Sequence, residues 1–213
     1  MASKYPEPHR DVDAALRESE AFFGGRGAVH RTLRSLVERL DREGIPYAIL
    51  GGMALNVHGF VRETVDVDVL MTKEGLDRFR ERFLGRGYAP AFQGARKSYR
   101  DAETGVRIDV ITTGEFPGDG RPKDISFPEP SLVAIERGGI RVLPLEDLVG
   151  LKLASGLSAE HRRHIDLADV QRVIEELRLP LGFDERLHPS VRAEYRRLWE
   201  LAQHAGEGPV ERE

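Results

Sequence analysis

Cysteine is absent from this chain of 213 residues. Its absence excludes disulfide bonds, zinc sites built on thiolates and cysteine nucleophiles. Any bound metal ion must therefore be held by oxygen or imidazole ligands. The seven histidines lack the spacing of a metal-binding helix pair, so carboxylates are the ligands to look for.

Lysine is also scarce, and positive charge does not dominate the chain. Only five of the 32 basic residues are lysine, and the formal net charge is -4. These values exclude a uniformly basic coat for nucleic acid and a polybasic membrane anchor. Any contact with nucleic acid must come from a local basic surface, and each of the few lysines is a candidate for a specific role.

Long hydrophobic runs are missing as well. The first eight residues, MASKYPEP, lack the apolar stretch of a signal peptide, and no later run approaches the length of a membrane span. We therefore expect a cytoplasmic protein with no membrane partner. With 40% hydrophobic and 32% charged residues, the chain can bury a core that offsets its conformational entropy.

The spacing of apolar residues predicts an α/β (α+β) fold, with a small mixed sheet and flanking helices followed by a helical C-terminal half. Helical spacing favours helices over 12–23, 28–43, 53–58, 73–84, 145–155, 160–177 and 190–204. Short apolar or alternating runs favour strands over 47–50, 65–70, 105–111, 132–136 and 140–143. A loop rich in proline and glycine spans 112–130, and loops of this length are often functional. We expect N-terminal helices over 1–45, an α/β core over 46–144 and a helical region over 145–213.

Three aspartates occupy alternating positions of two predicted strands. Asp66 and Asp68 project from one face of their strand, with Cα atoms roughly 6.6 Å apart. Asp109 alternates with apolar neighbours in the same way. If the two strands are neighbours, the carboxylates converge, and hard oxygen ligands in this number suit a pair of Mg²⁺ or Mn²⁺ ions. Alternatively, all three are ordinary solvent-facing residues of a half-exposed sheet. The opposite face of the first strand, expected to be buried, carries Val65, Val67 and Val69.

Gly51 and Gly52 stand between the strand at 47–50 and the helix that follows it. Glycines at this place let backbone N–H groups approach phosphate oxygens, and a helix N-terminus favours an anion. A lone Gly-Gly is more often a simple turn. The order of strand, Gly-Gly, helix, Asp-x-Asp strand and third-aspartate strand is much more specific than any of its parts.

This order of motifs resembles the nucleotidyltransferase superfamily that includes DNA polymerase β. In particular, it is similar to the small bacterial branch that contains the AbiEii-type abortive-infection toxins and their uncharacterised relatives. The resemblance covers roughly residues 46–178. It rests on Leu50-Gly51-Gly52-Met53-Ala54-Leu55, His58-Gly59, Arg62, Thr64, Asp66-Val67-Asp68, Ile108-Asp109-Val110 and the segments 144–155 and 163–170.

The resemblance implies transfer of a nucleoside monophosphate from an NTP, such as ATP, to an acceptor hydroxyl with release of pyrophosphate. Asp66 and Asp68 would bind two Mg²⁺ or Mn²⁺ ions, and Asp109 would complete the metal site and help to deprotonate the acceptor. Many superfamily members carry Gly-Ser where this chain has two glycines, although the most similar branch also uses two. The implied nucleotide-binding residues are Gly51, Gly52, Arg62, Thr64, Lys152 and Asp166.

The supporting residues also have simpler interpretations. Lys152 would neutralise the triphosphate, with Asp166 orienting it, or it reaches solvent from a packed helix while Asp166 joins an intrahelical ion-pair network. Arg62 and Thr64 would form a second shell around metal or phosphate, or they are ordinary polar residues of an edge strand.

Three functions remain open at this stage. The first is a toxin-like enzyme that modifies RNA, such as a tRNA end, together with a possible antitoxin protein and without DNA-specific readout. The second modifies a small molecule of the aminoglycoside or lincosamide type, and the third is a nucleotide-binding regulatory module without turnover. Arginines in the helical half favour RNA, whereas the net acidity favours a cationic small acceptor. The presence of all three aspartates counts against the third.

Overall fold

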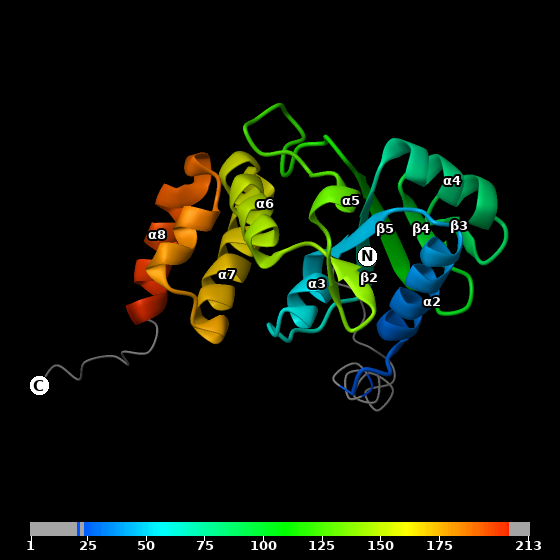
Figure 1. Cartoon of the computed structure of the whole chain (residues 1–213), viewed down its shortest axis with the longest axis horizontal. Helices are drawn as coiled ribbons and strands as arrows, with labels where there is room; N and C mark the ends of the chain where they lie inside the picture. The colour runs from blue at the N-terminus through cyan, green and yellow to red at the C-terminus, as the bar shows by residue number, and fades with distance from the viewer. Residues whose placement is uncertain (1–20, 22–23, 205–213) are drawn as a thin grey trace, which may run out of the picture.

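The computed structural model describes residue 21 and residues 24–204. In this part of the chain, one mixed sheet forms with the strand order β3-β4-β5-β2-β1-β7-β6 (Figure 1). The sheet and its helices confirm the predicted α/β fold. The strands are β1 (Tyr47–Leu50), β2 (Asp66–Met71), β3 (Tyr88–Pro90), β4 (Ser98–Asp101), β5 (Arg107–Thr112), β6 (Ile135–Arg137) and β7 (Ile140–Val142).

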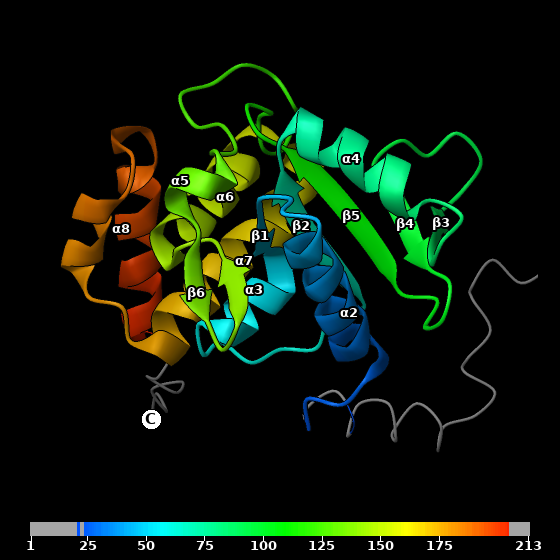
Figure 2. The same cartoon turned by 45° about the vertical axis from the view of Figure 1, so that its right-hand side comes forward.

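Helices surround the sheet and continue beyond it. α2 and α4 lie across one face of the sheet (Figure 2), and α6, α7 and α8 pack together at the end next to β1 and β7 (Figure 1). No helix in the described ranges is both long and apolar enough to cross a membrane. The helices are α2 (Ala28–Arg42), α3 (Gly51–Val57), α4 (Lys73–Phe83), α5 (Pro130–Val133), α6 (Leu145–Ser158), α7 (Glu160–Leu177), the 3₁₀ helix η1 (Leu181–Arg186) and α8 (Pro189–His204).

Two faces of the sheet differ in polarity, and this difference positions the site. On the covered face, Tyr99 of β4 packs its ring 5.1 Å from that of Phe79 in α4. Tyr99 is the register partner of Ile108 in β5, so Ile108 shares this covered face. Side chains at the alternate positions, including Asp109, therefore point to the opposite face.

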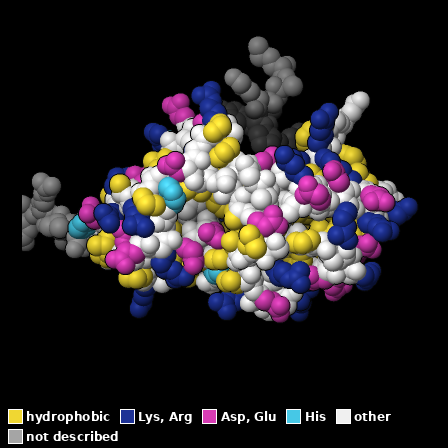
Figure 3. All heavy atoms as spheres, turned by 45° about the horizontal axis from the view of Figure 1, so that its top comes forward, with side chains coloured by type: hydrophobic (Ala, Val, Ile, Leu, Met, Phe, Trp, Pro, Cys, Tyr) yellow, Lys and Arg dark blue, Asp and Glu magenta, His cyan; other side chains and the backbone are white. Residues whose placement is uncertain are grey.

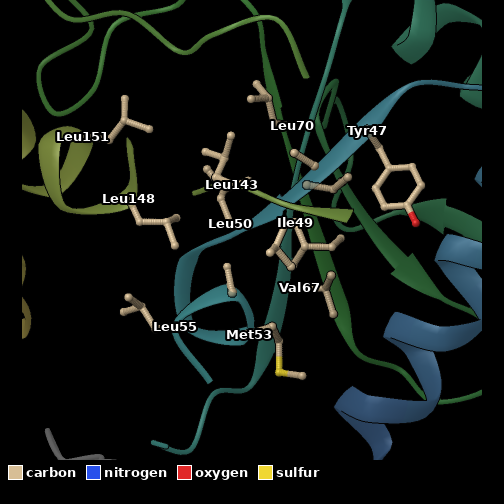
Figure 4. Packing of buried hydrophobic residues seen from close by; sticks show 14 of the residues in the cluster. Tyr47, Ile49, Leu50, Met53, Leu55, Val67, Leu70, Leu143, Leu148 and Leu151 are labelled. Atoms are coloured by element: carbon tan, nitrogen blue, oxygen red, sulfur yellow. The ribbon is translucent and has the colours of Figure 1, made fainter. Parts of the chain in front are cut away.

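A second apolar layer joins the sheet to the helical half. Leu50 and Leu143 lie between the central strands and α6, where Leu148 and Leu151 meet them (Figure 4). All four side chains are buried. This layer holds α6 next to the end of β1, where the Gly-Gly turn begins.

Some sequence predictions need correction. The strand predicted over 132–136 is wrong in its first part, because Pro130 begins the short helix α5 and β6 starts only at Ile135; proline is well suited to a first helical position. β3 and β4 were not predicted, since β3 has three residues including Pro90 and β4 is mostly polar. The predicted helix over 12–23 falls almost wholly outside the described residues. The boundary near residue 144 remains a prediction.

Candidate active site

Two parallel strands bring the predicted carboxylates onto one face of the sheet. β2 and β5 pair in parallel, with Asp68 opposite Asp109 and Asp66 opposite Arg107. Between the aspartates, Val67 is fully buried on the other face, as predicted. Val65 corrects that prediction: it is 76% exposed because β2 begins only at Asp66.

Gly51 makes room for the carboxylate of Asp68. Helix α3 starts at Gly51, two residues earlier than predicted, and Gly51 has a left-handed φ of 64°. A Cβ atom built there would overlap Oδ2 of Asp68 and stand 2.9 Å from its Cγ. Gly52 is similarly close to Thr64, whose Cβ would be 2.9 Å away. The absence of side chains at the two glycines therefore leaves the space that Asp68 and Thr64 occupy, in addition to any contact of their backbone N–H groups with phosphate.

Asp68 has an unusual acidity. Its carboxylate makes no hydrogen bond or ion pair with the described residues. Burial, followed by repulsion from Asp66 and Asp109, raises the pKa of Asp68 to about 7. Lys152 and Arg162 oppose this shift without cancelling it. The free site thus holds a proton near neutral pH that a cation would have to displace.

This raised pKa predicts that Asp68→Asn stabilises the metal-free protein at alkaline pH. The folded carboxyl keeps its proton up to about pH 7, whereas the unfolded one loses it near 3.8. The folded state therefore binds more protons in between, and its free energy of unfolding falls as pH rises through this window. Asn removes the penalty, which should amount to on the order of 2–4 kcal/mol at pH 8 and vanish near pH 4.

Urea unfolding in EDTA at several pH values measures this difference. The matched control is Asp77→Asn, because Asp77 lies on α4 with its side chain 73% exposed. A pH-independent difference between Asp68→Asn and the wild type would contradict the assignment.

Arg107 belongs to the site, and the sequence interpretation missed it. Its Nη2 donates to Oδ2 of Asp66 at 2.9 Å, and its Nε lies 3.1 Å from Oδ2 of Asp109. Arg107 is two residues before Asp109, so the strand alternation puts it on the same face. That alternation was the available signal, although the partner on β2 depends on strand pairing.

Thr64 and Arg62 occupy different places. Thr64 lies beside Asp66 and donates from Oγ1 to Oδ1 of Asp66 at 3.1 Å. Arg62 points instead to the helical half, where its Nη2 is 3.4 Å from Oδ2 of Asp169. The Nε of Arg62 is buried without a hydrogen-bond partner among the described residues.

Lys152 and Asp166 meet across the α6–α7 pair. Nζ of Lys152 contacts Oδ1 of Asp166 at 3.2 Å and Oδ2 of Asp169 at 2.8 Å. The buried Asp166 also accepts from Ser155 at 2.6 Å and from Arg162 at 3.2 Å. Burial acts to raise the pKa of Asp166, but Lys152, Ser155 and Arg162 outweigh it and hold the pKa below its usual value. Asp166 therefore stays ionised beside Lys152.

A cleft of about 340 Å³ connects the two clusters. Gly51 and Asp68 line it on the sheet side, and Lys152 lines it on the helical side. The loop predicted over 112–130 supplies a third wall with Phe116 and Phe127.

That wall is anchored to α6. A Cβ on Gly118 would come within 2.8 Å of the Ser155 carbonyl oxygen, so the loop packs tightly on the helix. Lys123 adds a 2.8 Å hydrogen bond to Oγ of Ser158.

The donor set suits a hard divalent cation, although the side chains are not arranged around one. Asp66, Asp68 and Asp109 offer only oxygen ligands, the kind that Mg²⁺ prefers. Over the described residues, however, no three acidic or histidine side chains are placed to hold a metal ion. Asp66 and Asp109 are both turned toward Arg107. The residues fit the ion chemically, provided that this contact opens.

One solved structure supports the fold. The crystal structure of ANT(2″)-Ia in complex with adenylyl-2″-tobramycin superposes with a TM-score of 0.51 and 13% identity, covering 78% of this chain and 96% of that one. A nucleotidyltransferase structure from H. pylori gives a TM-score of 0.46 at 15% identity, covering 95% and 100%. One from Thermotoga maritima gives 0.42 at 18%, covering 80% and 94%. No match is found among curated proteins.

The family assignment comes from the sequence as a whole. The family described as "Uncharacterised nucleotidyltransferase" matches residues 2–198. This match spans the β2–β5 carboxylates, the Gly-Gly turn and the α6–α7 cluster. The chain therefore belongs to this nucleotidyltransferase family and is a transferase of nucleoside monophosphates.

Proposed function

We propose that the chain transfers a nucleoside monophosphate from an NTP to an acceptor hydroxyl, with release of pyrophosphate, at the cleft beside Asp66, Asp68 and Asp109. The observation that carries this proposal is the parallel register that sets Asp68 beside Asp109, with Lys152 lining the same cleft. Phosphoryl transfer needs alignment and charge neutralisation more than covalent help from the protein.

The three aspartates are the proposed ligands of two Mg²⁺ or Mn²⁺ ions. Such ions would supply neutralisation of the phosphate charge. Asp109 is the proposed acceptor of the proton from the attacking hydroxyl. Thr64 holds Asp66 through its hydroxyl hydrogen bond, and Gly51 leaves space for Asp68.

The helical side of the cleft is the proposed triphosphate site. Lys152 uses two of its three N–H donors on Asp166 and Asp169, which leaves one for a phosphate oxygen. Arg62 retains a buried Nε without a partner among the described residues. Gly52, like Gly51, lies in the first turn of α3, where backbone N–H groups lack helical partners.

Lys152→Ala should raise the Michaelis constant for NTP about tenfold or more and change kcat less. The reason is the loss of a charge-assisted hydrogen bond of about 1.5–3 kcal/mol. Steady-state kinetics with varied NTP measure the effect, and the control is Lys73→Ala, because Lys73 is an exposed residue of α4. An unchanged Michaelis constant in a folded variant would remove Lys152 from the site.

RNA is the proposed acceptor, and the β3–β4 region supplies the supporting charge. Residues 78–100 contain seven basic residues and one acidic residue in a chain whose net charge is -4. At the end of the molecule formed by α4 and this hairpin, basic side chains lie among acidic ones (Figure 3). β4 pairs directly with β5, next to Asp109.

Individual arginines in this region remain available for a polyanion. The side chains of Arg86 and Arg96 are exposed and make no hydrogen bond or ion pair with the described residues. Other basic residues of the same region have acidic partners: Arg80 with Asp77, Arg82 with Glu43, and Lys97 with Glu115. In the helical half, several arginines are paired in the same way: Arg172 with Glu176, Arg186 with Glu146, Arg196 with Asp184, and Arg197 with Glu194. The support for RNA in the hairpin region therefore rests on Arg86 and Arg96.

The test incubates the protein with each labelled NTP, Mg²⁺ and either total tRNA or a panel of aminoglycosides and lincosamides. Labelled tRNA supports the proposal. Labelled drug supports the small-molecule alternative, which the similarity in fold to ANT(2″)-Ia, seen with adenylyl-2″-tobramycin, favours. Binding of NTP without any transfer would indicate the regulatory module and contradict the proposed activity.

We also propose a toxin role of the AbiEii type, with ATP among the NTPs to be tried first and a protein antitoxin as partner. Induced expression should then arrest growth, and Asp109→Asn should abolish the arrest. Unimpaired growth with soluble, active enzyme would contradict the toxin role while leaving the transferase proposal intact.

A further inference from the structure

The positive charge of Arg107 lies between two carboxylates of the site. Its guanidinium bridges Asp66 and Asp109 with contacts of 2.9 and 3.1 Å, from two neighbouring strands. The first of these carboxylates has its other oxygen bound by Thr64. A fork of this kind fits two carboxylates at once, because guanidinium is planar and carries several donors.

The contact of Arg107 with two carboxylates also reduces the repulsion among the three aspartates in the metal-free protein. Three carboxylates on one face repel one another, and this repulsion contributes to raising the pKa of Asp68. Arg107 neutralises part of that charge through the two carboxylates it contacts. Its side chain is 48% exposed, so the guanidinium can leave toward solvent without disturbing the core.

We propose that Arg107 is an internal counter-ion that competes with the divalent cation for Asp66 and Asp109. In the free protein it holds these carboxylates together, and the contact opens when the metal ion binds. Arg107 is thus a positioning residue that sets how tightly metal is taken up. This inference rests on the proposed function, because it assumes that the carboxylates bind a divalent cation.

The expected consequence is a change in metal affinity with a definite sign. If the guanidinium competes, Arg107→Gln should bind Mn²⁺ about three- to tenfold more tightly than the wild type. If Arg107 instead supports the bound form by orienting the carboxylates, the same substitution should weaken binding. The two roles therefore predict opposite shifts.

The experiment titrates Mn²⁺ into the full chain without NTP and follows free Mn²⁺ by electron paramagnetic resonance. The control is Arg141→Gln, because Arg141 pairs with Asp41 at 3.0 Å and is 47% exposed, far from the carboxylates in the sequence and on strand β7. It should leave the affinity for Mn²⁺ unchanged. Arg107→Lys keeps the charge without the planar fork and should fall between wild type and Arg107→Gln.

Thermal unfolding supplies a second readout. In EDTA, Arg107→Gln should melt below Arg141→Gln, and saturating Mn²⁺ should raise its melting temperature by more than it raises that of the wild type. Equal or weaker Mn²⁺ binding by folded Arg107→Gln overturns the inference. Because the titration needs no turnover, failure here with active wild type is distinguishable from failure of the proposed transfer.

Discussion

Replacing Asp109 with Asn should lower the rate of nucleotidyl transfer about 10³-fold, equivalent to about 4 kcal/mol in the transition state. Asp109 is the register partner of Asp68, and the amide can neither accept the hydroxyl proton nor bind a divalent cation as a charged ligand. The carboxamide is nearly isosteric, so the fold should be retained. Single-turnover transfer to the acceptor found in the labelling assay measures the rate.

Two controls make this result specific. Asp77→Asn removes an exposed carboxylate from α4 and should leave the rate unchanged. Thermal unfolding should show that Asp109→Asn is folded. If folded Asp109→Asn transferred nucleotide at the wild-type rate, the assignment of the carboxylate face as the active site would be wrong.

Gly51→Ala should destabilise the protein by about 2–5 kcal/mol and abolish transfer. A side chain at a φ of 64° costs about 1–2 kcal/mol, and forcing a methyl group into a filled space costs about 1–3 kcal/mol more. The methyl group would overlap the carboxylate of Asp68. Since Asp68 cannot keep its position, activity should fall further than stability alone explains.

The chain offers a matched glycine that separates these two costs. Gly44 has a φ of 60°, and nothing lies within 4 Å of a Cβ built on it. Gly44→Ala therefore measures the conformational cost alone in urea unfolding. The excess cost of Gly51→Ala should largely disappear in an Asp68→Ala background, and an excess that persists there would show that Asp68 is not the obstacle.

The central strands were predictable because polar and apolar residues alternate along them, which distinguishes the two faces of each strand. Asp66 and Asp68 alternate with buried Val67 and Val69, and a half-buried strand produces that pattern wherever it lies in the sheet. Helix α2 was predictable within one residue for a related reason, since its apolar side chains recur at helical spacing and line one buried stripe. Local periodicity carries this information without any knowledge of neighbours.

The elements that escaped prediction have weak local patterns. β4 reads Ser98-Tyr99-Arg100-Asp101 and becomes a strand because Tyr99 packs on α4 while its backbone pairs with β5. Asp101 is buried there, and its Oδ1 accepts a hydrogen bond from the backbone N–H of Glu103 in the turn. Such residues gain their environment from partners distant in sequence, so tertiary context overrides their propensity.

By itself, the sequence determined the oxygen-only chemistry, the alternation of Asp66, Asp68 and Asp109 with apolar neighbours, and the Gly-Gly turn between strand and helix. Only the tertiary structure decided that β2 and β5 are parallel neighbours, that Arg107 bridges two of the carboxylates, and that Arg62 turns to Asp169 of α7. The physical reason is the distance in sequence over which each kind of information acts. Periodicity is local to a few residues, whereas the neutralisation of charge depends on which segments the folded chain places side by side.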